Sequence, residues 1–248
     1  MKKFLLFSMI SLMALMAVPS SAYAQDNKAK KEVVTEAGFH QVILEKMVDG
    51  GIWFMSIVLL CLVIGLAVAI ERVIMLNLAT TNVKLLLTDL ADRVKDGGVQ
   101  SAREYVAGVK GPVASIFSQG LLRANEGIEG VEKAIVGYGS VEMGKLEKGM
   151  VWISLFISLA PMLGFMGTVI GMIDAFDQIM AADDISASIV AGGIKKALLT
   201  TVAGLIVAVI LQVFYNYCVS KIDSIVNQME DASISFVDML VAHDVLKK

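Results

Sequence analysis

The run "APMLGFMGTVIGMIDAF" (residues 160–176) is apolar enough for a membrane, yet it holds a hydroxyl and a carboxylate, on Thr168 and Asp174. A charged side chain within or at the edge of a membrane span is costly, and it usually faces a bundle interior or a water-filled cavity. At about 100° per residue, these two share one helix face with small residues, namely Ala160, Gly164, Gly167 and Gly171. Small residues let a second backbone approach closely, so helix packing is the alternative explanation of this face.

A second polar stripe lies on the next apolar run. Its members step by 3, 4, 4 and 3 residues, which sets them along one side of a helix: Thr201, Gly204, Ala208, Gln212 and Tyr215. Helix packing, with threonines bonded to their own backbone carbonyls, is again the alternative. Two such stripes on adjacent helices predict a hydrated seam, which can pass protons or hold a polar partner helix.

Lys195 and Lys196 stand at the start of this second run. Residues 197–219 are long enough to cross a membrane alone, so both lysines can extend their charged heads to the interface. Residues 185–194 are also uncharged, and a helix that begins there would put Lys196 inside the bilayer. Both interpretations stay open at the level of sequence.

The composition predicts the elements that position these residues. Of the 248 residues, 56% are hydrophobic and the mean hydropathy is +0.73, as is typical of membrane proteins. Only three prolines and no alternating Val/Thr/Tyr runs favour long helices over a β-barrel. We therefore predict an all-α integral membrane protein. Its three mature transmembrane helices are the first at residues 50–71 and two more within residues 150–219, at 150–173 and 197–219.

The chain begins like a secretory signal peptide. Lys2 and Lys3 precede an apolar stretch of 15 residues, and Ala22, Tyr23 and Ala24 form a small-residue cleavage site. An uncleaved anchor is the alternative, although a membrane span needs roughly 20 residues. We predict a signal peptide at residues 1–24 and a polar periplasmic segment at residues 25–49.

Positive charge sets the expected orientation. Residues 72–149 carry ten Lys and Arg, whereas the connection at 181–194 carries none. Because basic loops stay in the cytoplasm, we predict a cytoplasmic helical domain at 72–149 and a periplasmic N-terminus in the inner membrane. Within that domain, helix breaks are expected at Gly97-Gly98, Gly111-Pro112 and Gly127.

The last segment, residues 220–248, is predicted to be a cytoplasmic C-terminal helix. Its apolar residues follow a heptad-like spacing: Ile222, Ile225, Met229, Ala232, Phe236 and Met239. These apolar residues either pack on the helices of the cytoplasmic domain, or they show that spans two and three both extend below the membrane as paired helices. We predict that both spans extend into the cytoplasm.

Other features exclude other classes of protein. A net charge of −3 gives no basic surface for nucleic acid. Cys61 and Cys218 lie inside apolar runs, so no disulfide framework is expected. The sequence has no HExxH, GxSxG or P-loop motif and no Cys/His cluster, and His40 and His243 lie far apart. We therefore predict neither an enzyme nor a bound metal or cofactor.

These motifs together resemble the ExbB/TolQ/MotA proton-channel family, and most closely its ExbB branch. Residues 160–176 match the family pattern A-P-x-L-G-x-x-G-T-V-x-G-M-I-x-x-F almost throughout. The third-span pattern A-L-x-x-T-x-x-G-L is met at Ala197, Leu198, Thr201, Gly204 and Leu205. Upstream, "GPVASIFSQGL" and "EMGKLEKGM" resemble the family's cytoplasmic segments, so that the resemblance covers about residues 50–245.

The resemblance implies a homo-oligomer, a pentameric ring around two helices of an ExbD-like single-pass protein that has an aspartate in its span. Proton entry along that aspartate would drive rotation, and a TonB-like protein would carry the work to the outer membrane. Motif matching makes Thr168 and Thr201 the pore-lining threonines, whose hydroxyls can both donate and accept a hydrogen bond. A TolQ-like motor, a motility motor and a non-conducting membrane scaffold are the alternatives.

One position departs from the family pattern. ExbB members commonly have an acid directly before the A-L-L of the third span, where this chain has Lys196. Asp174 is then the acid left on the small face of the second span. The predicted proton-pathway residues are Thr168, Thr201, Asp174 and Lys196, and the predicted helix-packing residues are Gly164, Gly167, Gly171 and Gly204. The sequence does not say whether Asp174 and Lys196 meet.

Overall fold

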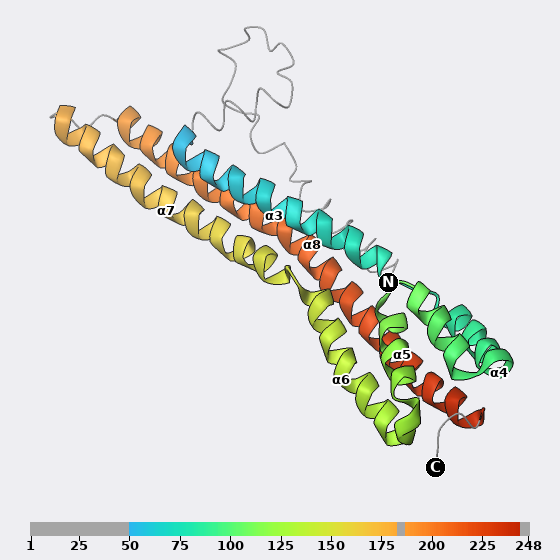
Figure 1. Ribbon diagram of the computed structural model, residues 1–248. Coiled ribbons are helices and arrows are strands. Elements are labelled where there is room, and N and C mark those ends of the chain that lie inside the picture. The colour runs from blue at the N-terminus through green and yellow to red at the C-terminus, as the bar shows by residue number, and fades with distance from the viewer. Residues whose placement is uncertain (1–49, 183–186, 244–248) are drawn as a thin grey trace, which may run out of the picture. The chain divides into compact units, whose positions relative to one another are not determined.

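The computed structural model describes residues 50–182 and 187–243, and within these ranges the regular structure is entirely helical (Figure 1). The predicted signal peptide and periplasmic segment lie outside the described residues. The helices in chain order are α3 (Ile52–Leu78), α4 (Val83–Gly108), α5 (Pro112–Leu122), η2 (Ala124–Glu126), α6 (Gly127–Glu147), α7 (Met150–Ala182) and α8 (Ala187–Ala242).

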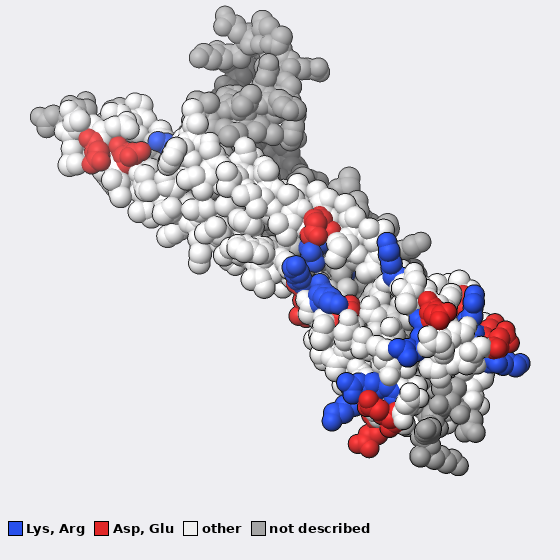
Figure 2. All heavy atoms as spheres, viewed as in Figure 1, with Lys and Arg blue, Asp and Glu red and all other residues white. Residues whose placement is uncertain are grey.

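Among the described residues, α3, α7 and α8 are the three helices long and apolar enough to cross a membrane. Figure 1 shows all three running alongside one another. Their outward side chains are large and apolar, as on Trp53, Phe165 and Ile206. On the face shown in Figure 2, charged side chains gather over the other helices and near the α7–α8 connection, and the stretch between is uncharged. The predicted all-α membrane fold is therefore confirmed.

The second and third spans differ in how they continue beyond this apolar stretch. α8 runs unbroken for 56 residues, whereas α6 and α7 are separate helices joined through Lys148 and Gly149. Gly149 has φ 89°, a conformation that favours glycine. The Arg72 side chain packs on it, so that a methyl group added at Gly149 would lie 3.1 Å from Arg72 Nε. Arg72 is itself buried and bonds to the Glu71 carboxylate at 2.8 and 2.9 Å.

The far part of α8 packs on α4, α5 and α6. Its buried residues are Ile222, Ile225, Met229, Ala232, Phe236 and Leu240. The sequence predicts Met239 as the last buried residue of this series. The structure buries Leu240 instead and leaves Met239 only partly buried. Residues 222 and 240 are 18 apart, which is five turns of a straight α-helix, whereas Met239 fits the 3.5-residue period of a supercoil. Phe236 stacks on Phe117 of α5 with ring centroids 4.4 Å apart.

Positive-φ glycines shape the helices between the first two spans, as the sequence predicted. Gly98, Gly111 and Gly127 have φ of 68°, 132° and 84°. At Gly98 the backbone of α4 is non-helical, and the two parts of the helix fold back on each other, so that the Tyr105 hydroxyl donates to the Asp89 carboxylate at 2.6 Å across 16 residues of chain. This hydrogen bond raises the pKa of Tyr105.

Candidate functional site at the seam between α7 and α8

The two helices α7 and α8 lie antiparallel in very close contact, which we call the seam. A methyl group added at Gly204 would lie 2.5 Å from the Ala160 carbonyl oxygen, and one at Gly164 would lie 2.9 Å from the Thr200 carbonyl oxygen. At Gly171 it would lie 3.2 Å from Ala197 Cβ. At Gly204 and Gly164 backbone meets backbone, so no side chain larger than hydrogen fits there without moving a helix, and at Gly171 a side chain would be tightly packed.

Two consecutive threonines of α8 meet the seam differently. Thr200 is 2% exposed and packs on Gly167, and its hydroxyl donates to Ala197 O at 2.7 Å and lies 3.3 Å from Gly164 O. Thr201 is half-buried, and its hydroxyl donates across the seam to Gly164 O at 3.2 Å. Both hydroxyls therefore converge on one carbonyl of α7, one sealed inside the contact and the other at its edge.

The predicted polar stripe of α8 lies beside the buried face. Apart from Gly204, its members are half-buried, whereas the buried face consists of Ala197, Thr200, Gly204, Val207 and Leu211. Thr200 was not singled out by its sequence pattern. The signal that identifies it is the 3, 4, 3, 4 spacing of that buried set, which is the spacing of a helix contact.

Thr168 lies at the edge of the small face of α7. Its hydroxyl donates to Phe165 O at 2.6 Å, one turn back on its own helix. This bond uses its proton, while its oxygen keeps lone pairs that can accept a hydrogen bond from water or a partner. Thr168 is partly exposed, so that oxygen remains accessible.

Asp174 and Lys196 do meet. Lys196 Nζ lies 3.3 Å from Asp174 Oδ2, and the two side chains are 41% and 47% exposed. Because α8 begins at Ala187, Lys196 stands well inside the helix and not at its first turn. The pair lines a hollow of about 360 Å³ together with the start of α3 and with Ile170 and Thr200.

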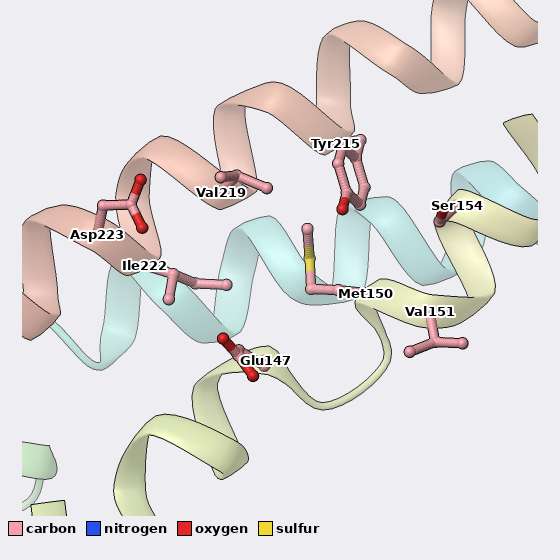
Figure 3. Close-up of a pocket in the computed structure, with 8 residues that line it drawn as sticks. All are labelled: Glu147, Met150, Val151, Ser154, Tyr215, Val219, Ile222 and Asp223. Carbon is pink, nitrogen blue, oxygen red and sulfur yellow. The ribbon is translucent and has the colours of Figure 1, made fainter. Parts of the chain in front are cut away.

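A second hollow, of about 420 Å³, lies where α6 gives way to α7 (Figure 3). Figure 3 shows Tyr215 and Asp223 on α8 across from Met150 and Glu147. Ser154 adds a further hydroxyl to its lining. Glu147 belongs to the segment "EMGKLEKGM", which resembles a family segment, whereas no sequence pattern pointed to Asp223. In the described part of the chain, no group of three His, Cys, Asp or Glu is arranged to hold a metal.

Fold and seam define a helical, multi-pass membrane protein with polar groups at the contact of two spans. The model of a protein family described as "MotA/TolQ/ExbB proton channel family" matches residues 109–231. A putative biopolymer transport protein ExbB homolog of Methanothermobacter thermautotrophicus is 30% identical over 193 residues, which are 77% of this chain and 68% of that protein. The biopolymer transport protein ExbB of Pseudomonas putida is 36% identical over 88 residues, 36% of this chain and 26% of that protein.

The chain belongs to the MotA/TolQ/ExbB proton channel family. The resemblance read from residues 160–176 and from the third-span motif is thus confirmed. Both motifs contribute to the seam, because the second-span glycines and the third-span residues Ala197, Thr201 and Gly204 face one another there.

Proposed function

We propose that the chain is the proton-channel subunit of an inner-membrane motor that uses the proton motive force to energise TonB-dependent transport across the outer membrane. Membership of the proton channel family supports the channel, and the name "biopolymer transport protein" of the relatives supports a transport role. The polar groups of the seam support a path for protons through the membrane half of the molecule.

The observation that carries the proposal is the difference between the two consecutive threonines. Thr201 holds a carbonyl of α7 with its proton and keeps its oxygen at the accessible edge of the seam, while Thr200 is sealed. With its proton on a backbone carbonyl, the oxygen of Thr201, like that of Thr168, can still accept a hydrogen bond from water and so anchor a water chain along which protons pass. We assign Thr201 and Thr168 to that path, and the Asp174–Lys196 pair to its mouth at the α7–α8 connection.

The half-buried stripe beside the seam is the proposed contact for the partner. Thr201, Ala208 and Gln212 are partly accessible in a single chain, although they lie in the apolar stretch of α8. A polar stripe of this kind suits a partner helix that also has a polar residue. The proposed assembly is a homo-oligomer, a pentamer, around an ExbD-like single-pass protein with an aspartate in its span, and it works with a TonB-like protein. The N-terminus is proposed to be periplasmic and residues 72–149 cytoplasmic.

A pair of isosteric substitutions tests the path. Thr201→Val removes the accessible hydroxyl and keeps its volume, so the fold should survive while proton-driven import falls by about a hundredfold, the lower bound for a positioned proton-transfer group. Thr200→Val is the matched control and should change import little. The Thr200 hydroxyl is buried away from the accessible edge, and the Ala197 carbonyl that it contacts also accepts a backbone hydrogen bond within its helix. Growth on a scarce substrate imported across the outer membrane is the readout, with protein level checked by immunoblot.

Two results would overturn this assignment. If both variants grow like the wild type, the path does not use Thr201, and a non-conducting scaffold gains weight. If both fail alike while oligomer and protein level are intact, the distinction between the accessible and the sealed hydroxyl is wrong. Envelope integrity, measured in parallel by detergent sensitivity, separates import from TolQ-like work.

A further inference from the structure

The side chain of Lys196, on α8, contacts Asp174 of α7 and Gly51 at the start of α3. We call this part of the three membrane helices, on the side of the α7–α8 connection, the loop end. The ammonium of Lys196 pairs with Asp174 at 3.3 Å. Its stem lies against Gly51, where an added methyl group would come within 2.8 Å of Lys196 Cε and 3.6 Å of its Nζ. Gly51 is the residue from which α3 starts, and its carbonyl accepts the bond from Met55 N at 3.1 Å.

Among the described residues, the first turns of α3 bury less of their surface than its middle does. Ile52 and Trp53 are 62% and 79% exposed, and the first buried side chain of α3 is Val58. Further along, α3 is fixed by close contact, since Gly65 packs on Leu211 of α8. Apolar packing therefore secures the middle of α3, whereas its first turns are only half-buried at Phe54 and Met55 and have the Lys196 stem as a further contact at Gly51.

Lysine suits this three-way contact for physical reasons. Its ammonium is a compact charge on a flexible four-carbon stem, so the stem can lie on one helix while the head pairs with another. Arginine would keep the charge, but its planar guanidinium is wider and would crowd Gly51. Gly51 in turn has φ 90°, a conformation that favours glycine. Because glycine has no side chain, the Lys196 stem can lie directly against the backbone there.

We propose that Lys196 is a positioning residue that ties the start of α3 to the seam and thereby sets the width of the hollow at the loop end. Trp53 and Phe54 of α3 form one side of that hollow, and Ile170, Asp174 and Thr200 form the other. The hollow leads to the seam at Gly167, so its width controls access to the path; this consequence rests on the proposed function. Lysine at this position thus acts through geometry.

Hydrogen–deuterium exchange of the full chain in lipid nanodiscs tests the tie directly. Lys196→Met keeps the stem and removes the charge that holds it, so amides at residues 52–58 and 170–178 should exchange roughly tenfold faster, as a locally opened helix end does. Lys196→Arg should leave 170–178 as in the wild type and loosen only 52–58, because the pair with Asp174 persists while Gly51 is crowded. Lys221→Met, on the same helix but far from the loop end, should change neither segment.

The outcomes separate this inference from the channel proposal, because exchange requires no proton flux. Unchanged exchange at 52–58 in Lys196→Met, or an equal change in Lys221→Met, overturns the tie. Import-dependent growth of the same strains tests its consequence. Growth should fall in Lys196→Met and to a lesser degree in Lys196→Arg, in the order of the exchange rates at 52–58. Faster exchange with undiminished growth in both variants overturns the role of Lys196 in controlling access.

Discussion

The two halves of α8 use the same face of one helix but pack it with different residues. In the apolar half, the closest contacts with α7 are made by the small residues Ala197, Thr200 and Gly204, and the buried face continues with Val207 and Leu211. In the other half, the buried residues are mostly large: Ile222, Ile225, Met229, Phe236 and Leu240. Figure 1 shows α8 passing without interruption from the one environment to the other.

The difference follows from the solvent. In a bilayer a large apolar side chain gains little by leaving lipid for protein, so helices associate through close backbone contact and small residues. In water, burying a large apolar side chain contributes about 1.5–3 kcal/mol, and large residues are favoured. Close backbone contact through small residues at the α7–α8 seam, and burial of large side chains further along α8, are consistent with this difference.

The largest effect is expected where backbone meets backbone. In Gly204→Leu the new side chain would meet Ala160 O and Gly164 Cα, which cannot rotate away. The cost should exceed the usual ~1–3 kcal/mol of overpacking, and the α7–α8 pair should not form. Native mass measurement and thermal melting of the purified protein check this. Gly144→Leu, where an added methyl group meets nothing within 4 Å, is the control. An unchanged oligomer and melting temperature in Gly204→Leu would contradict the packing argument.

The next largest effect is expected in the half of α8 that packs on α4, α5 and α6. Phe236 is fully buried and stacked on Phe117, so Phe236→Ala should cost about 3–5 kcal/mol. The loss should stay local: limited proteolysis should cleave α5 and the end of α8 faster, while the membrane helices remain protected. Val241→Ala, at an exposed position of α8, should behave like the wild type. Equal protease sensitivity of the two variants would show that the Phe stack does not hold this region.

The smallest effect is expected at the junction of the two halves. Gly149→Ala places a side chain at φ 89° and against Arg72, which should cost roughly 1–2 kcal/mol. Gly144→Ala supplies the opposite sign, because alanine in an open helix position stabilises by roughly 0.5–1 kcal/mol relative to glycine. Melting temperatures of the two variants should therefore move in opposite directions. A shift of both in the same direction would mean that the break does not depend on glycine.

The sequence is sufficient for features that depend on one helix at a time. Periodicity and composition predict three membrane helices, and the small face of residues 160–175 is visible on a helical wheel. The pairing of Asp174 with Lys196 depends instead on the register of two antiparallel helices, which no single wheel contains. The same limit applies to Thr200 and Thr201: a wheel gives the 100° between them, but not which one faces the neighbour. Arg72 at the α6–α7 break depends on three segments far apart in the chain.

The unbroken length of α8 has a mechanical consequence. Its 56 residues measure about 84 Å, so a tilt of about 5° at one end displaces the other by about 7 Å. The neighbouring pair α6 and α7 is interrupted at Gly149 and does not act as one rod. Among the described membrane helices, α8 thus connects the seam to the Phe117–Phe236 stack through one continuous helix, and a tilt of α8 about Thr201 would displace the stack in proportion to its distance from Thr201.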